Sequence, residues 1–155
     1  MLTPRRATPT DAAQIARLNR HIQSWHAAQY PETFHAEPDP AEVTAHFAAR
    51  LAEPGVTCLL LGDPPQAYAL LSLQDRPASP FSPARRRLMI DHIAVDPAFR
   101  RQGFGRALLA AARAEARALV CDEILLDTWE ANHDAHRFFA AEGFAPRRSL
   151  WRALP

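Results

Sequence analysis

Apolar residues recur every three or four positions in four parts of the chain, a spacing that places them on one face of a helix. The first helix is expected to start at Thr10 or Asp11 and to end near Ala28, before Pro31. The second is expected to start at the capping pair Asp39-Pro40 and to stop at Pro54-Gly55. The pattern predicts the last two helices over residues 107–119 and 132–142, with Gly143 ending the fourth.

Short apolar and branched runs between the helices predict β-strands. The expected strands cover residues 2–7, 56–61, 67–73, 88–95 and 123–129, with one or two closing strands over 144–154. Gly62-Asp63-Pro64-Pro65 is a turn signal, so the second and third strands are expected to form a hairpin. Residues 75–87, rich in Pro, Ser and Arg, are expected to form a loop. This order predicts one domain over residues 1–155, an α/β fold with a mixed sheet and helices on both faces.

Composition narrows the possible partners. The formal net charge of +1 provides no overall field that would favour nucleic acid or a membrane surface. All basic residues are arginines, and the densest run, 85–87, is either a solvated loop or a collar for an anionic ligand. Cys58 and Cys121 have neither disulfide nor metal-site spacing and are interpreted as small core residues in a reducing compartment. The N-terminal residues contain no apolar signal-peptide core, so we expect a cytoplasmic protein.

The segment from residue 88 to residue 109 contains the most informative chemistry. An apolar strand ends before Pro97, and a glycine-bearing turn then leads into a helix. The first N–H groups of a helix lack internal partners, and the helix dipole adds partial positive charge there. Gly103 and Gly105 lack Cβ atoms, so a phosphate group can come close to the backbone. The alternative is that both glycines serve only a tight turn.

Three phosphate-binding patterns resemble this turn. The P-loop needs a lysine, and the chain contains none. The dinucleotide fingerprint needs a third glycine where Leu108 stands. The third pattern is Arg/Gln-x-x-Gly-x-Gly/Ala after a strand ending in Val. It is matched by Arg100, Gly103 and Gly105 after Val95, and in this the chain resembles the GNAT N-acetyltransferases.

The second half of the chain extends that resemblance to about residues 88–145. The strand around residues 124–129 is followed by Asn132, then Phe138-Phe139, then Gly143-Phe144. In GNAT enzymes a strand is likewise followed by Asn, by a helix bearing Phe-Tyr, and by Gly-Phe. The resemblance implies a GNAT-like, mostly antiparallel sheet that is splayed between its fourth and fifth strands.

The resemblance also implies acetyl-CoA as co-substrate, with no metal. The pyrophosphate is expected on the N–H groups of the glycine turn, and the pantetheine arm along the strand that ends at Val95, like an added strand. Asn132 matches the position that contacts the pantetheine arm, and it can equally cap a helix. The expected cofactor-binding residues are Ile93, Ala94, Val95, Arg100, Arg101, Gln102, Gly103, Phe104, Gly105, Arg106 and Asn132.

Two positions bear on the chemistry. Asp91 is the leading candidate for the base that leaves the attacking amine neutral, and it is expected to share a strand face with Ile93 and Val95. The alternative is that Asp91 pairs with an arginine, for example in the 85–87 run. His92 is expected to point to the opposite face.

Phe139 occupies the position where the family often has the tyrosine that protonates the leaving thiolate. Solvent, His136, Tyr68 or Tyr30 remain as alternative acids. His133 and His136, three residues apart, have no third ligand at motif spacing and are interpreted as surface histidines, not metal ligands.

The resemblance implies an N-acetyltransferase that acts on a small-molecule amine or a protein N-terminal amine, as a monomer or homodimer. A catalytically silent acyl-CoA-binding module is the alternative, because Phe139 lacks a hydroxyl group. A nucleotide-binding domain that uses the same glycine turn is a third hypothesis. The sequence contains no signature of the acceptor.

Overall fold

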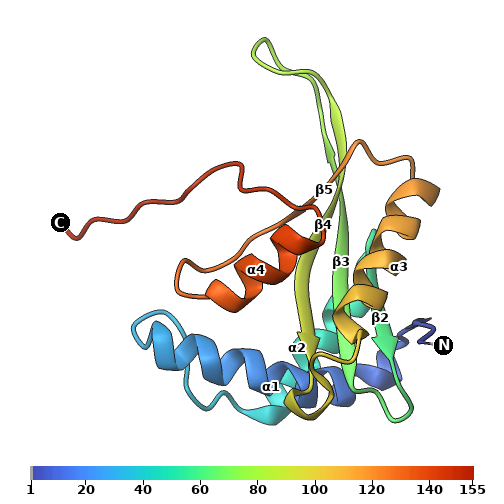
Figure 1. The fold of residues 1–155 in the computed structure, drawn as a ribbon, viewed down its shortest axis with the longest axis vertical. Coiled ribbons are helices and arrows are strands. Elements are labelled where there is room, and N and C mark those ends of the chain that lie inside the picture. The colour runs from blue at the N-terminus through green and yellow to red at the C-terminus, as the bar shows by residue number, and fades with distance from the viewer. Residues whose placement is uncertain (1) are drawn as a thin grey trace.

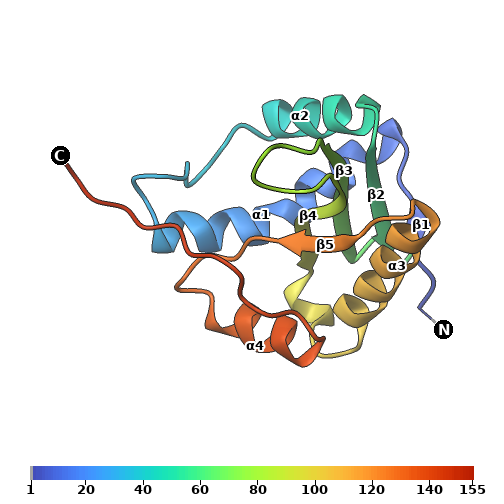
Figure 2. The same cartoon turned by 90° about the horizontal axis from the view of Figure 1, so that it is seen from above.

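The protein is described by a computed structural model over residues 2–155, in which a five-stranded sheet separates two pairs of helices (Figures 1 and 2). The elements in chain order are β1 (Arg5–Arg6), α1 (Ala12–Gln29), α2 (Pro40–Ala52), β2 (Val56–Leu61), β3 (Ala67–Arg76), β4 (Arg85–Val95), α3 (Phe104–Ala118), β5 (Glu123–Leu126) and α4 (His133–Ala141). The strands lie in the sheet in the same order. All neighbours are antiparallel except β4 and β5, which are parallel. The predicted mixed sheet with helices on both faces is confirmed.

Each face of the sheet supports its own hydrophobic core. On one face, α1 and α2 cover a cluster that is centred on Ile15, Leu18, Phe47 and Tyr68. On the other face, α3 and α4 cover a second cluster made by alternate residues of the same strands. The two clusters use alternate residues because successive side chains of a strand point to opposite faces of the sheet. The view in Figure 2 shows the two helix pairs on opposite sides of the strands.

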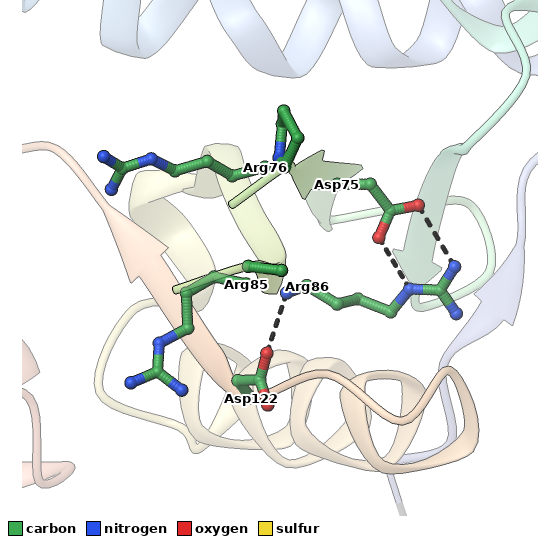
Figure 3. A pocket seen from close by; sticks show the side chains of 7 residues that line it. Asp75, Arg76, Arg85, Arg86 and Asp122 are labelled. Carbon is green, nitrogen blue, oxygen red and sulfur yellow. Dashed lines mark hydrogen bonds and ion pairs between the residues drawn. The ribbon is translucent and has the colours of Figure 1, made fainter. Parts of the chain in front are cut away.

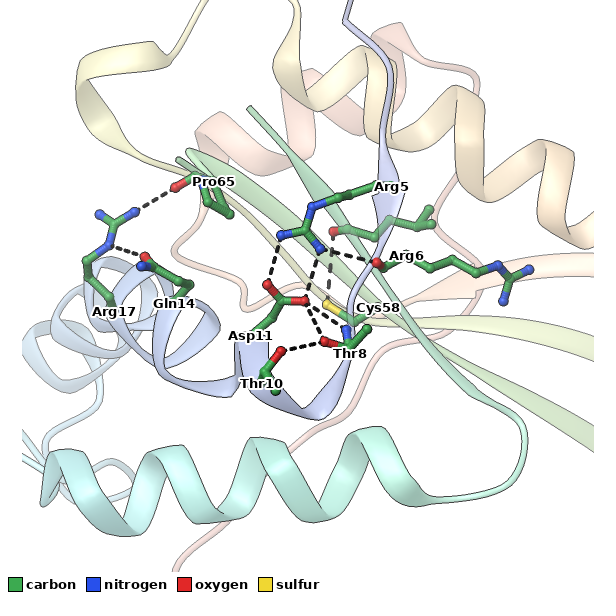
Figure 4. A network of polar contacts seen from close by, with 10 residues as sticks. Arg5, Arg6, Thr8, Thr10, Asp11, Gln14, Arg17, Cys58 and Pro65 are labelled. Atoms are coloured by element: carbon green, nitrogen blue, oxygen red, sulfur yellow. Dashed lines mark hydrogen bonds and ion pairs between the residues drawn. The ribbon is translucent and has the colours of Figure 1, made fainter. Parts of the chain in front are cut away.

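Short polar motifs fix where the first helices start. The Asp39 carboxylate accepts a hydrogen bond from the Ala41 N–H at 2.7 Å, which confirms the predicted cap of α2. At the start of α1, Arg5 donates two hydrogen bonds to Asp11, at 2.8 and 3.0 Å, and Thr8 N–H donates a third (Figure 4). These hydrogen bonds, chiefly those from Arg5, hold the pKa of the Asp11 carboxyl group well below its usual range. The network ties β1 to the first helix.

The loop predicted over residues 75–87 is confirmed only for residues 77–84, and both ends of the predicted range belong to strands. β3 continues to Arg76 and β4 already starts at Arg85, so the two strands form a long hairpin that projects from the body (Figure 1). Asp75 accepts two hydrogen bonds from the Arg86 side chain, and the Arg86 N–H donates to Asp122 (Figure 3). Cross-strand pairing therefore overrides the loop-like composition, because Asp75 and Arg86 stand opposite each other in register.

The C-terminal prediction also needs correction. β5 ends at Leu126, earlier than expected, and no strand is assigned to residues 144–155, so the closing strands are absent from the described chain. The last residues run away from the body in both views (Figures 1 and 2). Within residues 2–155, no helix is both long and apolar enough to cross a membrane.

Candidate functional site

The parallel strands β4 and β5 stay together over only four residue pairs. Pairing runs from Arg87 with Glu123 to Ile90 with Leu126. β4 then continues to Val95, and residues 92–95 have strand partners only on the β3 side. The backbone of this segment therefore presents an open edge where β5 has ended, which is the separation that the family resemblance implies.

A β-bulge lies at the beginning of this open edge. Leu71 pairs with Ile90 and Leu70 pairs with His92, so Asp91 is an extra residue without a partner in β3. A bulge reverses the alternation of side chains beyond it. Ile90 and Ile93 accordingly both contact the cluster under α3 and α4, whereas Asp91 and His92 both face α2.

The expected faces of two side chains were therefore wrong. Asp91 does not share a face with Ile93 and Val95, and His92 does not point away from Asp91. The sequence pattern suggests that side chains alternate between the two faces along the whole strand. It gives no sign of an extra residue in one strand, and such a residue shifts the alternation.

Asp91 forms an ion pair with Arg50 of α2. The Arg50 guanidinium lies 2.9 Å from Asp91 Oδ2 and also contacts Glu53. The pairing of Asp91 with an arginine is thus found, but the arginine is not in the 85–87 run. Both side chains are about one-quarter exposed, and Oδ1 of Asp91 has no hydrogen-bond partner among the described residues. One carboxylate oxygen is therefore held in place and the other can accept a proton.

His92 belongs to a buried hydrogen-bonded chain on the same face. The Asn19 amide donates to the Tyr68 hydroxyl at 2.9 Å, and that hydroxyl lies 3.2 Å from His92 Nδ1. Because Asn19 can only donate through its amide nitrogen, the Tyr68 hydroxyl donates to Nδ1, and the neutral imidazole then has its proton on Nε2. Burial lowers the pKa of His92, which favours this neutral form.

The turn before α3 forms a cradle of backbone N–H groups. Arg101 and Gly103 both adopt left-handed backbone conformations, with φ of +62° and +87°. None of the N–H groups of residues 101–106 donates to any described protein group, and the first bonded one is Ala107 N–H, to Gly103 O. Successive free N–H groups at a helix start bind anions. A Cβ atom at Gly103 would meet only Leu2, at 3.8 Å, so the cradle is open above this residue.

Most polar side chains of this turn are bonded to other groups of the protein. Arg100 donates to Val95 O at 3.3 Å, Gln102 donates to Ala98 O, and Arg106 pairs with Glu142 at 2.9 Å. Phe104 is buried in the core under α3. The cradle therefore consists of backbone groups, and Arg101 is the one arginine of the turn for which no partner is found in residues 2–155.

Gly105 has a role in packing. A Cβ atom there would lie 2.9 Å from the tip of the Phe138 ring, closer than real contacts allow. The glycine lets α4 approach the start of α3, so its presence does not by itself indicate a phosphate. The two predicted roles thus divide between the two glycines: Gly103 shapes the turn and Gly105 admits the neighbouring helix.

Asn132 caps the start of α4, and Phe139 lies within this helix. Asn132 Oδ1 accepts from the Ala135 N–H at 3.2 Å, which confirms the predicted cap and leaves its amide N–H groups free to donate. Phe139 is only 8% exposed and packs near Phe138 and Phe144, with ring centroids 5.2 and 5.8 Å away. Residue 139 is therefore part of the core that faces β4.

An aromatic cluster that the sequence did not reveal lies beyond the end of β5. Phe34 stacks on His26 with ring centroids 4.7 Å apart, and Trp129 packs edge-on against Phe34 at 5.1 Å. The Tyr30 hydroxyl accepts a hydrogen bond from the Ala131 N–H at 3.0 Å, which joins the end of α1 to the segment after β5. The aromatic residues between positions 25 and 34 were the available signal, and only the fold shows that Trp129 joins them.

Other candidate sites carry less chemistry. In residues 2–155, no group of three His, Cys, Asp or Glu side chains could hold a metal ion. Cys58 is buried and Cys121 half-buried, and both are free thiols; burial raises the pKa of Cys58 to about 12. A shallow depression beside the hairpin is lined by three arginines and two aspartates, in which the Arg86 side chain pairs with Asp75 and the Arg86 N–H donates to Asp122 (Figure 3).

Comparisons with known proteins agree with this geometry. The family model described as "Acetyltransferase (GNAT) family" matches residues 19–144. Among curated proteins none matches the chain. A tetramutant of the BH1408 protein from Bacillus halodurans has a similar solved structure, with a TM-score of 0.91, 26% sequence identity and 98% of each chain covered.

Aminoglycoside N-acetyltransferase AAC(6')-Iy in complex with CoA is similar in fold. Its TM-score is 0.76 at 17% identity, over 99% of this chain and 95% of that chain. The structure of the same enzyme with a bisubstrate analogue has a TM-score of 0.75 at 18% sequence identity, over 100% of this chain and 99% of that chain. With the family model spanning most of its length, and with β4 parting from β5 beside the N–H cradle of α3, the chain belongs to the GNAT acetyltransferase family.

Proposed function

We propose that this protein is an acetyl-CoA-dependent N-acetyltransferase that transfers the acetyl group to a primary amine by direct attack on the thioester. The observation that carries the proposal is the continuity between two open backbone surfaces. The unpaired edge of residues 91–95 leads, through one short turn, to the free N–H groups of residues 101–106. An extended chain with amides, ending in a pyrophosphate, is the ligand shape that matches both surfaces.

Each surface has a distinct role in the proposal. The amides of the pantetheine arm pair with the backbone of Ile93 and Val95, as an added strand would, because the backbone of Ala94 between them faces Tyr68 of β3. The pyrophosphate lies on the N–H groups of the cradle, with Arg101 available to balance its charge. Asn132, at the start of α4, donates an amide hydrogen bond to the same arm. The GNAT match and the CoA bound to AAC(6')-Iy support this assignment.

The transfer step needs a neutral amine and a polarised carbonyl. An N–H of the open β4 edge donates to the thioester oxygen and stabilises the charge that develops there. Asp91 takes the proton of the ammonium group through Oδ1, directly or through a water, while Arg50 fixes the carboxylate. The neutral amine nitrogen then bonds to the acetyl carbon. As the bond from carbon to sulfur breaks, the nitrogen loses its second proton to solvent and the amide is left. The thiolate that leaves takes up a proton from solvent, because Phe139 has none to give.

The aromatic cluster forms the acceptor end of the proposed site. His26, whose pKa is lowered by burial, is neutral near pH 7, and it lies with Phe34 and Trp129 beyond the end of β5. Aromatic faces attract an ammonium group and pack on an apolar body. We therefore assign to this site an amine whose body is partly apolar, a class that includes small molecules and protein N-termini.

A panel of primary amines with acetyl-CoA, assayed by release of free thiol, tests the proposed activity. The expected result is thiol release that depends on the amine and is enhanced for amines with apolar bodies. The second candidate function, a silent acyl-CoA-binding module, is favoured by Phe139 and gives tight CoA binding with no thiol release. Binding of adenine nucleotides with no preference for CoA contradicts both.

A further inference from the structure

A chain of three hydrogen-bonded side chains connects α1, β3 and β4. The Asn19 amide donates to the Tyr68 hydroxyl at 2.9 Å, and this hydroxyl lies 3.2 Å from Nδ1 of His92. Tyr68 is buried, and burial raises the pKa of its hydroxyl group well above the usual value. Because the hydroxyl keeps its proton and accepts from Asn19, it donates that proton to Nδ1.

The chain decides which ring nitrogen of His92 has the proton. Nδ1 accepts from Tyr68, so the neutral ring has its proton on Nε2. Nε2 has no hydrogen-bond partner in residues 2–155, and it is not a buried atom, since the buried side-chain nitrogen that lacks a partner there is Arg87 Nε. A purely structural role would be fulfilled by Nδ1 alone. The chain therefore maintains a donor of fixed identity that opens to solvent.

The bulge in β4 places this donor beside the unbonded oxygen of Asp91. Asp91 and His92 are consecutive residues, yet both face α2. Arg50 holds Oδ2 of Asp91 at 2.9 Å, and Oδ1 has no hydrogen-bond partner in the described chain. A positioned acceptor and a positioned donor thus lie next to each other on the same face of the strand.

This donor and acceptor lie near the aromatic cluster beyond the end of β5. His26 of α1 is close enough to His92 to act on the charge of its ring, and the same His26 stacks on Phe34 at 4.7 Å. Both α1 and α2 cover the side of the sheet toward which His92 points (Figure 2). A molecule with its apolar body on the aromatic cluster therefore presents its polar end to Asp91 and His92.

We infer that His92 determines acceptor specificity, because its Nε2–H donates to an oxygen on the carbon next to the carbon that bears the amine. The inference rests on the proposed acetyltransferase function, since the same amine donates to Asp91. The substrate class is a primary amine with a neighbouring hydroxyl or carbonyl oxygen, found in 1,2-amino alcohols and in the α-amino carbonyl unit of a peptide N-terminus. Tyr68 and Asn19 are positioning residues that act through His92.

Nitrogen-15 NMR of protein with labelled histidine tests the position of the proton without any activity. At pH 8 the His92 signal, identified by its loss in His92→Gln, is expected to show the proton on Nε2. Asn19→Asp is expected to move it to Nδ1, because a carboxylate only accepts and Tyr68 must then donate to it and accept from the ring. Gln14→Glu, which adds the same charge at an exposed position of α1, is the matched control and keeps the proton on Nε2. A wild-type proton on Nδ1 overturns the inference.

Two matched pairs of amines test the substrate class by release of free thiol from acetyl-CoA. 2-Amino-1-phenylethanol differs from 2-phenylethylamine by one hydroxyl group, and phenylalanine amide differs from 1-phenylpropan-2-amine by a carboxamide in place of a methyl group. Wild-type kcat/KM is expected to be at least about tenfold higher for the oxygen-bearing member of one pair, and that pair identifies the source of the oxygen. The ratio should fall to about one in Asn19→Asp and persist in Gln14→Glu. Equal kcat/KM within both pairs, or an undiminished ratio in an Asn19→Asp variant whose proton has moved, overturns the inference.

A binding measurement separates this inference from the proposed activity. Thiol release with none of the amines contradicts the acetyltransferase proposal. The same amines are then titrated into the CoA-loaded protein while the His92 nitrogen signals are followed. An oxygen-bearing amine is expected to shift the Nε2 signal, and its partner without the oxygen is expected to leave that signal in place. An Nε2 signal that responds equally to both members of each pair, or to none of the amines, overturns the inference.

Discussion

The Arg50 guanidinium lies 2.9 Å from Asp91 Oδ2 and connects α2 to the bulge in β4. The contact exists because the extra residue in β4 turns Asp91 toward α2, away from the face of Ile93. It orients the carboxylate and leaves Oδ1 unbonded within residues 2–155. Arg50 is thus a positioning residue in the proposed mechanism, and Asp91 is the base.

Removing the base should lower turnover and leave cofactor binding almost unchanged. We expect Asp91→Asn to lower kcat by roughly 10²–10⁴-fold, because the amide cannot accept the proton. Arg50→Met should lower kcat less and should change its pH profile, since the carboxylate remains but is no longer held. Asp75→Asn is the control, because Asp75 has an equivalent arginine pair at the hairpin. Steady-state kinetics from pH 6 to pH 9 measure all three variants. Normal turnover by the Asp91→Asn variant shows that Asp91 is not the base.

The N–H cradle should lose CoA when a carboxylate is placed in it. Gly103→Asp adds a negative charge where the pyrophosphate is proposed to lie, and we expect calorimetry to show CoA affinity reduced by at least about tenfold. Gly143→Asp is a matched control, because φ is +86° at Gly143 and +87° at Gly103, and a Cβ has similar space at both. Both variants should lose about 1–2 kcal/mol of unfolding free energy from backbone strain. Equal CoA affinity in the two variants contradicts the proposed cradle.

Residue 139 tests whether the missing hydroxyl limits the reaction. The Phe139 ring is 8% exposed, so Phe139→Tyr keeps the packing and adds one hydroxyl group at its rim. We expect unfolding free energy to change by no more than about 1–2 kcal/mol. The hydroxyl should raise kcat if protonation of the thiolate limits turnover. A loss of CoA affinity together with marked destabilisation shows that residue 139 is buried away from the sulfur.

Stability should depend on pH through His92. Its folded-state pKa is lowered by burial below the usual 6.5, so the unfolded chain binds the proton more strongly. The stabilisation is complete above about pH 6.5 and is lost as the pH falls through the folded-state pKa. The groups facing His92 are Asp91 on its own strand, Tyr68 on β3, His46 and Arg50 on α2, and His26 on α1.

Thermal melts at steps between pH 5 and pH 8 measure this effect. The variant His92→Gln should show a smaller loss of Tm on acidification than the wild type, whereas His133→Gln, at an exposed position, should follow the wild type. A His92→Gln variant with an unaltered pH dependence shows that His92 does not supply it. His26, also half-buried and with its pKa lowered by burial, should add to the pH dependence over the same range.

Local signals made much of the fold predictable. The cap at Asp39 and the hairpin turn after Leu61 give element boundaries because short-range geometry decides them. The hairpin of β3 and β4 was not predictable from composition, because the pairing of Asp75 with Arg86 depends on register. The outcome for residues 144–154 has a different cause: a composition that suits a strand does not supply a pairing partner, and residues 145–155 form no backbone hydrogen bond with another strand.

The candidate site was predictable in part. The turn around Gly103 and the position of β4 follow from a contiguous motif, which sequence alone can reveal. The orientation of Asp91 and His92 depends on one extra residue in one strand, and the partner of Asp91 is 41 residues away. The cluster of Phe34 with Trp129 likewise joins distant segments. Contacts of this kind follow from the fold and leave no local pattern.

Amide hydrogen exchange with and without CoA tests most directly whether the open edge of β4 and the N–H cradle form one cofactor site. The amides of residues 91–95 that face away from β3, and those of residues 101–106, are unprotected by the chain itself and should exchange slowly once CoA is bound. Slowed exchange in both segments, absent in Gly103→Asp, is the predicted result. Saturating CoA that leaves both segments unchanged, or that protects only the depression between Asp75 and Asp122, contradicts the proposed site.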